Sequence, residues 1–118
     1  MISLKQQDQT KENIHLVVLY NELKEVSDIV NNEAETAYIK SQIALKKDII
    51  IINQYKRLVF LVQKPQEQDI PKKAEKLRRL GFEIQKLADE HKIKELQVEN
   101  NTPSTLNIID FIEGILLG

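Results

Sequence analysis

The densest run of apolar positions lies between Asp48 and Val62, where the sequence is DIIIINQYKRLVFLV. It contains two apolar segments, 49–52 and 58–62, which are rich in β-branched and aromatic residues and are typical of strands. The polar residues from Asn53 to Arg57 are few enough for a tight reversal. Continuous apolar runs are also typical of a sheet that is covered on both faces. The pattern therefore predicts a hairpin of two buried strands at the centre of the fold.

Three more segments have the pattern of strands. Residues 14–20, IHLVVLY, contain five aliphatic residues and predict a strong strand. Residues 1–4 form a short apolar start that suits an edge strand. Residues 93–98 alternate between apolar and polar positions, which indicates a half-buried or edge strand.

Three other segments have the pattern of helices. Residues 33–47 follow two asparagines, Asn31 and Asn32, either of which can cap a helix with acidic residues in its first turn. From Pro71 to about Lys92, the apolar residues form a stripe about 140° wide opposite a charged face. A last helix is expected over 106–117, after a serine and a threonine that can cap it.

Gly81 lies in the middle of the apolar stripe of the second helix. A glycine inside a helix costs roughly 1 kcal/mol relative to alanine. We therefore expect Gly81 to allow the close approach of a neighbouring backbone.

The elements follow one another as strand, strand, helix, strand, strand, helix, strand and helix. Helices that alternate with aliphatic strands indicate a layered α/β domain with a mixed sheet and helices on both faces. A chain of 118 residues is long enough for one domain with a real core but hardly for two. We therefore expect residues 1–118 to form a single domain.

The last helix has more apolar surface than one sheet requires. Its apolar residues span an arc of about 200°, whereas a helix that covers one small sheet needs a stripe of about 100°. Only Asn107, Asp110, Glu113 and Gly114 fall outside this arc. We therefore expect a second body, either another domain or another subunit, to pack on this helix. The expected contact residues are Leu106, Ile112, Leu116 and Leu117, together with Phe82, an aromatic residue on the charged face of the preceding helix.

The composition excludes several classes of protein. Lys and Arg number 17 and Asp and Glu number 18, so the net charge of −1 gives no general attraction to nucleic acid or to an anionic membrane. There is no cysteine, and therefore no disulfide framework and no thiolate metal site. The first residues contain no apolar signal segment, and no stretch approaches the ~18 apolar residues of a membrane span. We expect a soluble cytoplasmic protein.

The sequence contains no motif that carries catalysis. His15 lies within an aliphatic strand and His91 at the end of the apolar stripe, and neither has the spacing of a metal-binding motif. No nucleophile motif, glycine-rich nucleotide loop or P-loop is present. We therefore expect no catalytic, cofactor-binding or metal-binding residue in this chain.

A basic cluster at the start of the second helix is the one candidate for binding nucleic acid. Lys72, Lys76 and Arg79 belong to it, but Glu75 interrupts it and Glu83 follows Arg79 by four residues. No ladder of aromatic residues accompanies the basic ones. A solvated helix face is therefore favoured, and weak contacts with nucleic acid are the alternative.

The order and endings of these segments resemble the N-terminal domain of the leucyl aminopeptidase (cytosol aminopeptidase) family. The resemblance extends over nearly the whole chain and rests on collinear passages rather than on any one motif. These passages are MISL with IHLVVLY, then IIIINQYKRLVFLV, then KKAEKLRRLGFEIQKLADEHKIKELQVE, and finally FIEGILLG. The chain has fewer glycines than the family usually has before the hairpin and early in the long helix, which indicates a divergent branch.

The resemblance implies a three-layer, macro-domain-like α/β/α sandwich that is the non-catalytic part of a hexameric metallopeptidase. In that family a C-terminal domain binds two divalent metals, commonly Zn²⁺ or Mn²⁺, and removes N-terminal residues from peptides. The metal-ligating carboxylates and lysine lie in that other domain, so no catalytic residue is carried over to this chain. The expected partners are the chain's own catalytic domain and further copies of itself.

Two other functions stay open on the sequence. The chain could be a stand-alone α/β interaction module that dimerises through its last helix. It could also bind nucleic acid through the face from Lys72 to Arg79, with a strong dependence on salt.

Overall fold

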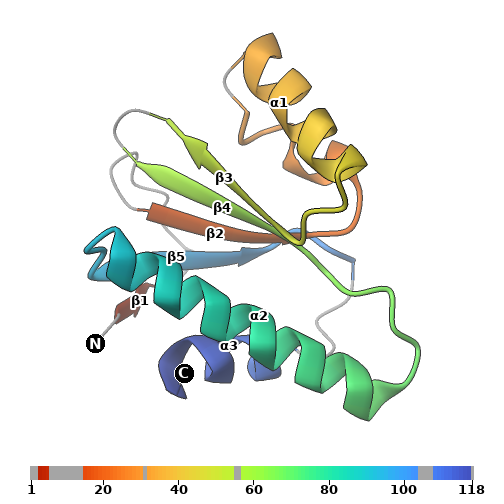
Figure 1. Ribbon diagram of the computed structural model, residues 1–118, viewed down its shortest axis with the longest axis vertical. Coiled ribbons are helices and arrows are strands. Elements are labelled where there is room, and N and C mark those ends of the chain that lie inside the picture. Colours follow the sequence, from red (N-terminus) through yellow and green to blue (C-terminus); the bar gives the residue numbers. More distant parts are fainter. Residues whose placement is uncertain (1–2, 6–14, 31, 55–56, 104–107, 118) are drawn as a thin grey trace.

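The structure is a computed structural model that describes residues 3–5, 15–30, 32–54, 57–103 and 108–117. Its centre is a five-stranded mixed sheet with the strand order β1-β5-β2-β4-β3 (Figure 1). The strands are β1 (Ser3–Lys5), β2 (His15–Tyr20), β3 (Ile49–Asn53), β4 (Leu58–Gln63) and β5 (Glu95–Asn100). Neighbouring strands are parallel except for β3, which is antiparallel to β4. The expected α/β class and mixed sheet are therefore confirmed.

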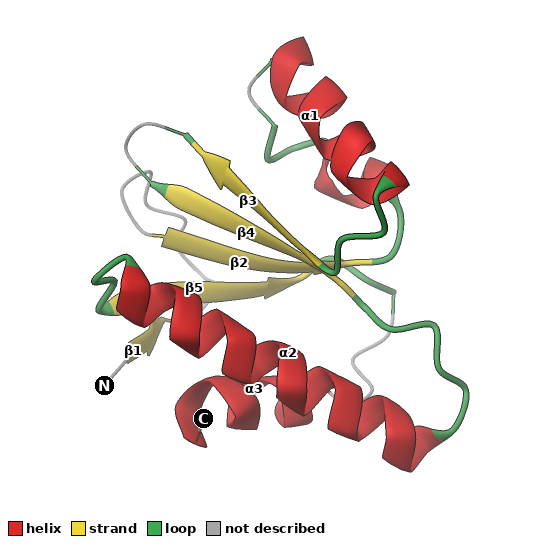
Figure 2. Cartoon of the chain, in the orientation of Figure 1, coloured by secondary structure: helices red, strands yellow, loops and turns green. Residues whose placement is uncertain are grey.

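The described residues also form three α-helices and one short 3₁₀ helix (Figure 2). They are η1 (Leu23–Val26), α1 (Glu33–Ala44), α2 (Ile70–Glu90) and α3 (Ile108–Leu117). The side chain of Asn32 caps α1 by accepting a hydrogen bond from Glu35 N at 2.9 Å. Asp69 caps α2 in the same way, at 3.1 Å from Lys72 N. The order of strands and helices is the expected one; the residues expected to cap the last helix lie outside the described residues.

Apolar side chains cover the two faces of the sheet as two separate clusters. Alternate residues of β2 and β4, among them Val17 and Phe60, pack against α2 and α3 on one face. The intervening residues, among them Val18 and Leu61, pack on the other face with η1 and with Ile39 of α1. Because side chains alternate along a strand, the continuous apolar runs supply both clusters at once.

The expected hairpin is present, but only one of its strands is central. Gln54 N donates to Arg57 O at 2.9 Å and closes the reversal between β3 and β4. β4 is buried on both faces, whereas β3 lies at the edge of the sheet. Ile50 and Ile52 are buried, but Ile49 and Ile51 are only half-buried. The prediction of two fully buried strands was therefore wrong for β3, since an edge strand has a neighbour on one side only.

The opposite edge of the sheet is formed by β1, as expected for the first residues of the chain. β5 lies between β1 and β2, and its residues Leu96 and Gln97 are buried. Of the two alternatives expected for residues 93–98, the edge strand was therefore wrong and the half-buried strand is confirmed, since the other residues of β5 are exposed or half-buried. Among the described residues, no helix is both long and apolar enough to cross a membrane.

Candidate interaction surface on α2 and α3

The two helices on the first face cross at a pair of glycines. A Cβ atom on Gly81 of α2 would overlap with the carbonyl oxygen of Phe111 in α3. A Cβ atom on Gly114 of α3 would overlap with the carbonyl oxygen of Arg78 in α2. The expected close approach at Gly81 is thus confirmed. Gly114 was expected outside the apolar arc of the last helix, but it is buried, because it faces the backbone of α2.

Ion pairs span the same crossing on the solvent side. Arg78 Nη2 lies 2.9 Å from Asp110 Oδ1 and 3.8 Å from Glu113 Oε2. These contacts join two consecutive turns of α3 to one residue of α2. The relative position of α2 and α3 is therefore set mainly by backbone contact inside the crossing, and the ion pairs add to it from outside.

A groove of about 490 Å³ runs between the exposed sides of α2 and α3. Two apolar side chains line it from opposite helices: Phe82, which is 42% exposed, and Leu117, which is 82% exposed. Charged residues of both signs surround them; these are Glu75, Arg78, Arg79, Glu83 and Glu113. The surface thus combines an apolar centre with a mixed charged rim, as protein interfaces do.

The outer face of α3 carries further apolar side chains. Ile109 is 68% exposed and Leu116 is 51% exposed, and the two residues are seven positions apart on one face of the helix. On the opposite face, Phe111 and Ile115 are almost completely buried. With Leu117, the exposed Ile109 and Leu116 make three large aliphatic residues that face solvent on a helix of ten residues.

The structure places most of the expected contact residues on this surface. Leu116, Leu117 and Phe82 are exposed, and Ile112 is half-buried. Leu106 lies outside the described residues. Ile109 was not singled out from the sequence, although its position seven residues before Leu116 could have identified it.

The basic face of α2 is largely engaged in ion pairs. Lys76 Nζ lies 3.0 Å from Glu67 Oε2, and this contact lowers the pKa of the Glu67 carboxyl below its ordinary value. Arg79 Nη2 lies 3.0 Å from Glu75 Oε1, and Lys72 is exposed at the start of the helix. The interspersed carboxylates leave a face of mixed sign rather than a continuous basic patch.

The two histidines come near each other at one end of the sheet. His15 Nδ1 accepts a hydrogen bond from Leu58 N at 2.9 Å. Burial lowers the pKa of His15, and the proximity of His91 lowers it further. Within the described ranges, no three His, Cys, Asp or Glu side chains gather closely enough to hold a metal ion.

The carboxyl ends of the central parallel strands, where α/β proteins often bind ligands, are joined by polar contacts. After β4, Lys64 is 2% exposed, and its Nζ donates to Thr102 Oγ1 at 3.4 Å. Burial lowers the pKa of the Lys64 amine, and Lys73 lowers it further. After β5, Asn101 N donates to Leu19 O at 2.9 Å, which ties the loop to β2.

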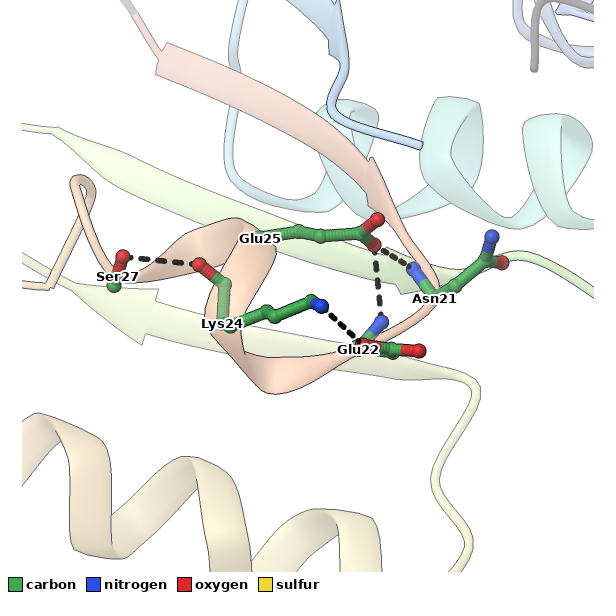
Figure 3. A network of polar contacts seen from close by, with 5 residues as sticks. All are labelled: Asn21, Glu22, Lys24, Glu25 and Ser27. Atoms are coloured by element: carbon green, nitrogen blue, oxygen red, sulfur yellow. Dashed lines mark hydrogen bonds and ion pairs between the residues drawn. The ribbon is translucent and has the colours of Figure 1, made fainter. Parts of the chain in front are cut away.

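The start of η1 closes the end of β2. Glu25 Oε1 accepts hydrogen bonds from Asn21 N at 2.6 Å and from Glu22 N at 3.0 Å (Figure 3). Asn101 Nδ2 in turn donates to Glu25 O at 2.9 Å. The polar side chains at this end of the sheet therefore hold loops together, and the α2–α3 surface is the stronger candidate for function.

Fold and surface together define an α/β domain with an exposed apolar surface and no recognisable catalytic group among the described residues. Comparisons of the chain with models of protein families, with curated proteins and with solved structures gave no match.

Proposed function

We propose that this chain is a non-catalytic assembly domain that packs against a larger body through the outer face of α3. The supporting observation is the exposure of Ile109, Leu116 and Leu117 on a short helix whose opposite face is buried. Single exposed apolar residues are common, but a cluster on one helix is typical of an interaction site.

The larger body in this proposal is the catalytic domain of a metal-dependent leucyl aminopeptidase. The passages quoted above motivate this assignment, and the α/β class with a mixed sheet is compatible with it. The domain would then be a three-layer, macro-domain-like sandwich that supports oligomer assembly and shapes access to the active site. The two divalent metals and the hydrolysis of peptides would belong to the other domain.

The coding sequence after codon 118 gives the first test. The aminopeptidase proposal expects a following domain with the carboxylates and lysine of a two-metal site. A stop codon at that position would favour the alternative, a stand-alone module that dimerises through α3. Saturable, stoichiometric binding of Zn²⁺ or Mn²⁺ to the 118-residue chain in calorimetry would contradict both the aminopeptidase proposal and the expectation that this chain has no metal-binding residue.

The second test is made on the surface of α3. Ile109→Ser with Leu116→Ser should leave the 118-residue chain folded, because both side chains already face solvent. In the longer protein the same substitutions should weaken assembly, measured by light scattering, and lower peptidase activity with it. Leu45→Ser is the matched control, since Leu45 is 66% exposed at the C-cap of a different helix, α1. Equal effects of the control and of the α3 variant would overturn the proposal.

A further inference from the structure

The outward side of α2 carries a regular row of six exposed residues, which we call the outer ridge. These residues are Lys72, Glu75, Arg79, Phe82, Lys86 and Asp89. Their spacing alternates between three and four positions, so they lie along one face of the helix, opposite the buried Leu77, Ile84 and Ala88. Two packed helices meet along rows with this spacing, usually of apolar residues, and here Phe82 is the apolar member of a charged row.

The charges of the outer ridge are complementary to those of a second outer ridge that runs in the opposite direction. If a second α2 lies antiparallel, with the two-fold axis between Arg79 and Phe82, Lys72 faces Asp89 and Glu75 faces Lys86. Arg79 then faces the aromatic ring of Phe82, a favourable pairing of a cation with an aromatic face. In a parallel arrangement each residue would face its own copy, and every charged pair would be repulsive.

We propose that α2 forms a two-fold symmetric homodimer through its outer ridge, in this antiparallel register. Charge complementarity identifies the partner as a second copy of this chain. A polyanion such as nucleic acid fits less well, because Glu75 and Asp89 interrupt the basic residues of the ridge. A two-fold interface of this kind uses one surface patch twice and therefore closes at the dimer.

The contacts that the ridge makes within one chain are weak enough to be exchanged. Glu75 and Arg79 form an ion pair at 3.0 Å, and their side chains are 61% and 78% exposed. Lys86 lies 3.7 Å from Glu83, and its Nζ is 5.5 Å from the centroid of the Phe82 ring. Exposed pairs of this kind contribute little to stability. The same groups are therefore free to turn toward a partner at small cost.

The groove beside the ridge adds apolar area to the contact. Phe82 belongs to the ridge and also lines the groove, with Leu117 of α3 on the other side. A partner helix on the ridge would cover Phe82 in both copies, and burial of an exposed aromatic ring stabilises association. The dimer is expected to be weak and sensitive to salt, because its remaining contacts are exposed charge pairs.

The register is tested by exchanging one charge pair between two variants. In a homodimer of Glu75→Lys, the introduced lysine of each chain faces Lys86 of the other chain. In a homodimer of Lys86→Glu, the introduced glutamate of each chain faces Glu75 of the other chain. Each variant alone should raise the dimer dissociation constant by about tenfold or more, measured by sedimentation at about 50 mM salt. An equimolar mixture should form a heterodimer with an affinity close to that of the unmodified chain, since opposite charges face each other again.

Three outcomes of the experiments on the unmodified chain and the charge variants would overturn the proposal. These are an unmodified chain that stays monomeric up to about 1 mM, single variants that dimerise as the unmodified chain does, and a mixture that associates no better than its components. If Glu75→Lys or Lys86→Glu fails to fold, a second pair of single variants, Lys72→Glu and Asp89→Lys, tests the same register at the ends of the ridge. Phe82→Ser should abolish the dimer.

Ile109→Ser on α3 is the control and should leave the dimer unchanged. This inference rests on α2 and does not depend on the aminopeptidase assignment. Dimerisation that is lost with Ile109→Ser and kept with Phe82→Ser would place the interface on α3 and overturn the role of the ridge.

Discussion

Gly81 of α2 and Gly114 of α3 lie against each other's helix backbone, so that neither position has room for a Cβ atom. A Cβ on Gly81 would also come within 2.9 Å of Ile115 N and 3.0 Å of Gly114 Cα. All these neighbours are backbone atoms, which cannot move aside as the end of a side chain can. The crossing of the two helices therefore depends on both glycines.

Gly81→Ala and Gly114→Ala are each expected to destabilise the fold. The gain in helix propensity, about 1 kcal/mol, is opposed by the separation of two packed helices, and overpacking typically costs about 1–3 kcal/mol. Urea unfolding measures the change, and the difference between Glu83→Ala and Glu83→Gly, at an exposed position inside α2, gives the propensity gain alone. The double variant should cost less than the sum of the single ones, because one separation of the helices relieves both overlaps.

His15 is expected to make the stability depend on pH. Its pKa in the folded state is lowered by burial and by His91, whereas in the unfolded chain it titrates near its ordinary value of about 6.5. Below that pH the unfolded chain binds more protons than the folded one, so stability falls as the pH falls. The protonated ring also loses the Nδ1 lone pair that accepts from Leu58 N.

The measurement is urea unfolding of the original chain and of His15→Asn at pH 8 and at pH 5. Asparagine keeps an acceptor oxygen near the position of Nδ1 but does not titrate. The loss of stability at pH 5 should therefore be smaller in the variant. An equal loss in both chains would show that His15 does not contribute to it.

The order of the elements could be predicted from the sequence because each depends on local periodicity. The close approach at Gly81 was predictable for a similar reason, since a glycine in an apolar stripe needs a packing explanation. Its partner Gly114 was not, because it stands beside Glu113 and at the margin of the apolar residues. Gly114 is buried because α3 crosses α2 at this position, and this contact between helices is not visible in the sequence.

The position of β3 at the edge could not be predicted, because strand order depends on pairing between distant segments. Four consecutive isoleucines predict a strand but do not tell how many neighbours it has. The outer ridge of α2 lies within a pattern that predicts only a solvated face. The structural features that favour the ridge as an interaction surface are the exposure of Phe82 and the adjacent groove with Leu117.

Thr102→Val is expected to destabilise the fold by about 1–3 kcal/mol, the usual contribution of hydrogen bonds that include one to a charged group. Thr102 Oγ1 accepts from the buried Lys64 Nζ and donates to Asn100 Oδ1 at 2.6 Å. Valine keeps the shape but removes both contacts. Ser41→Ala is the control, because the Ser41 hydroxyl also forms a hydrogen bond, to Tyr38 O at 2.6 Å, but is exposed to water. A similar cost for both substitutions would contradict the role of burial.

Tyr20→Phe is expected to leave the fold as stable as before, or to stabilise it by about 1 kcal/mol. Tyr20 is completely buried at the end of β2, and within the described part of the chain its hydroxyl has no hydrogen-bond partner. Burial raises the pKa of this hydroxyl, and Asp48 raises it further, so it stays protonated and uncharged at neutral pH. Phenylalanine fills nearly the same volume without the cost of removing a hydroxyl from water.

Thermal and urea unfolding of Tyr20→Phe measure this effect, with Tyr38→Phe as the matched control. Tyr38 is 46% exposed on α1, so its hydroxyl remains hydrated and its removal should change little. If Tyr20→Phe destabilises the chain by 1 kcal/mol or more, about the value of one hydrogen bond, the Tyr20 hydroxyl must have a partner in solution. The end of β2 would then hold a bound polar group, and the carboxyl ends of the strands would return as a candidate binding site.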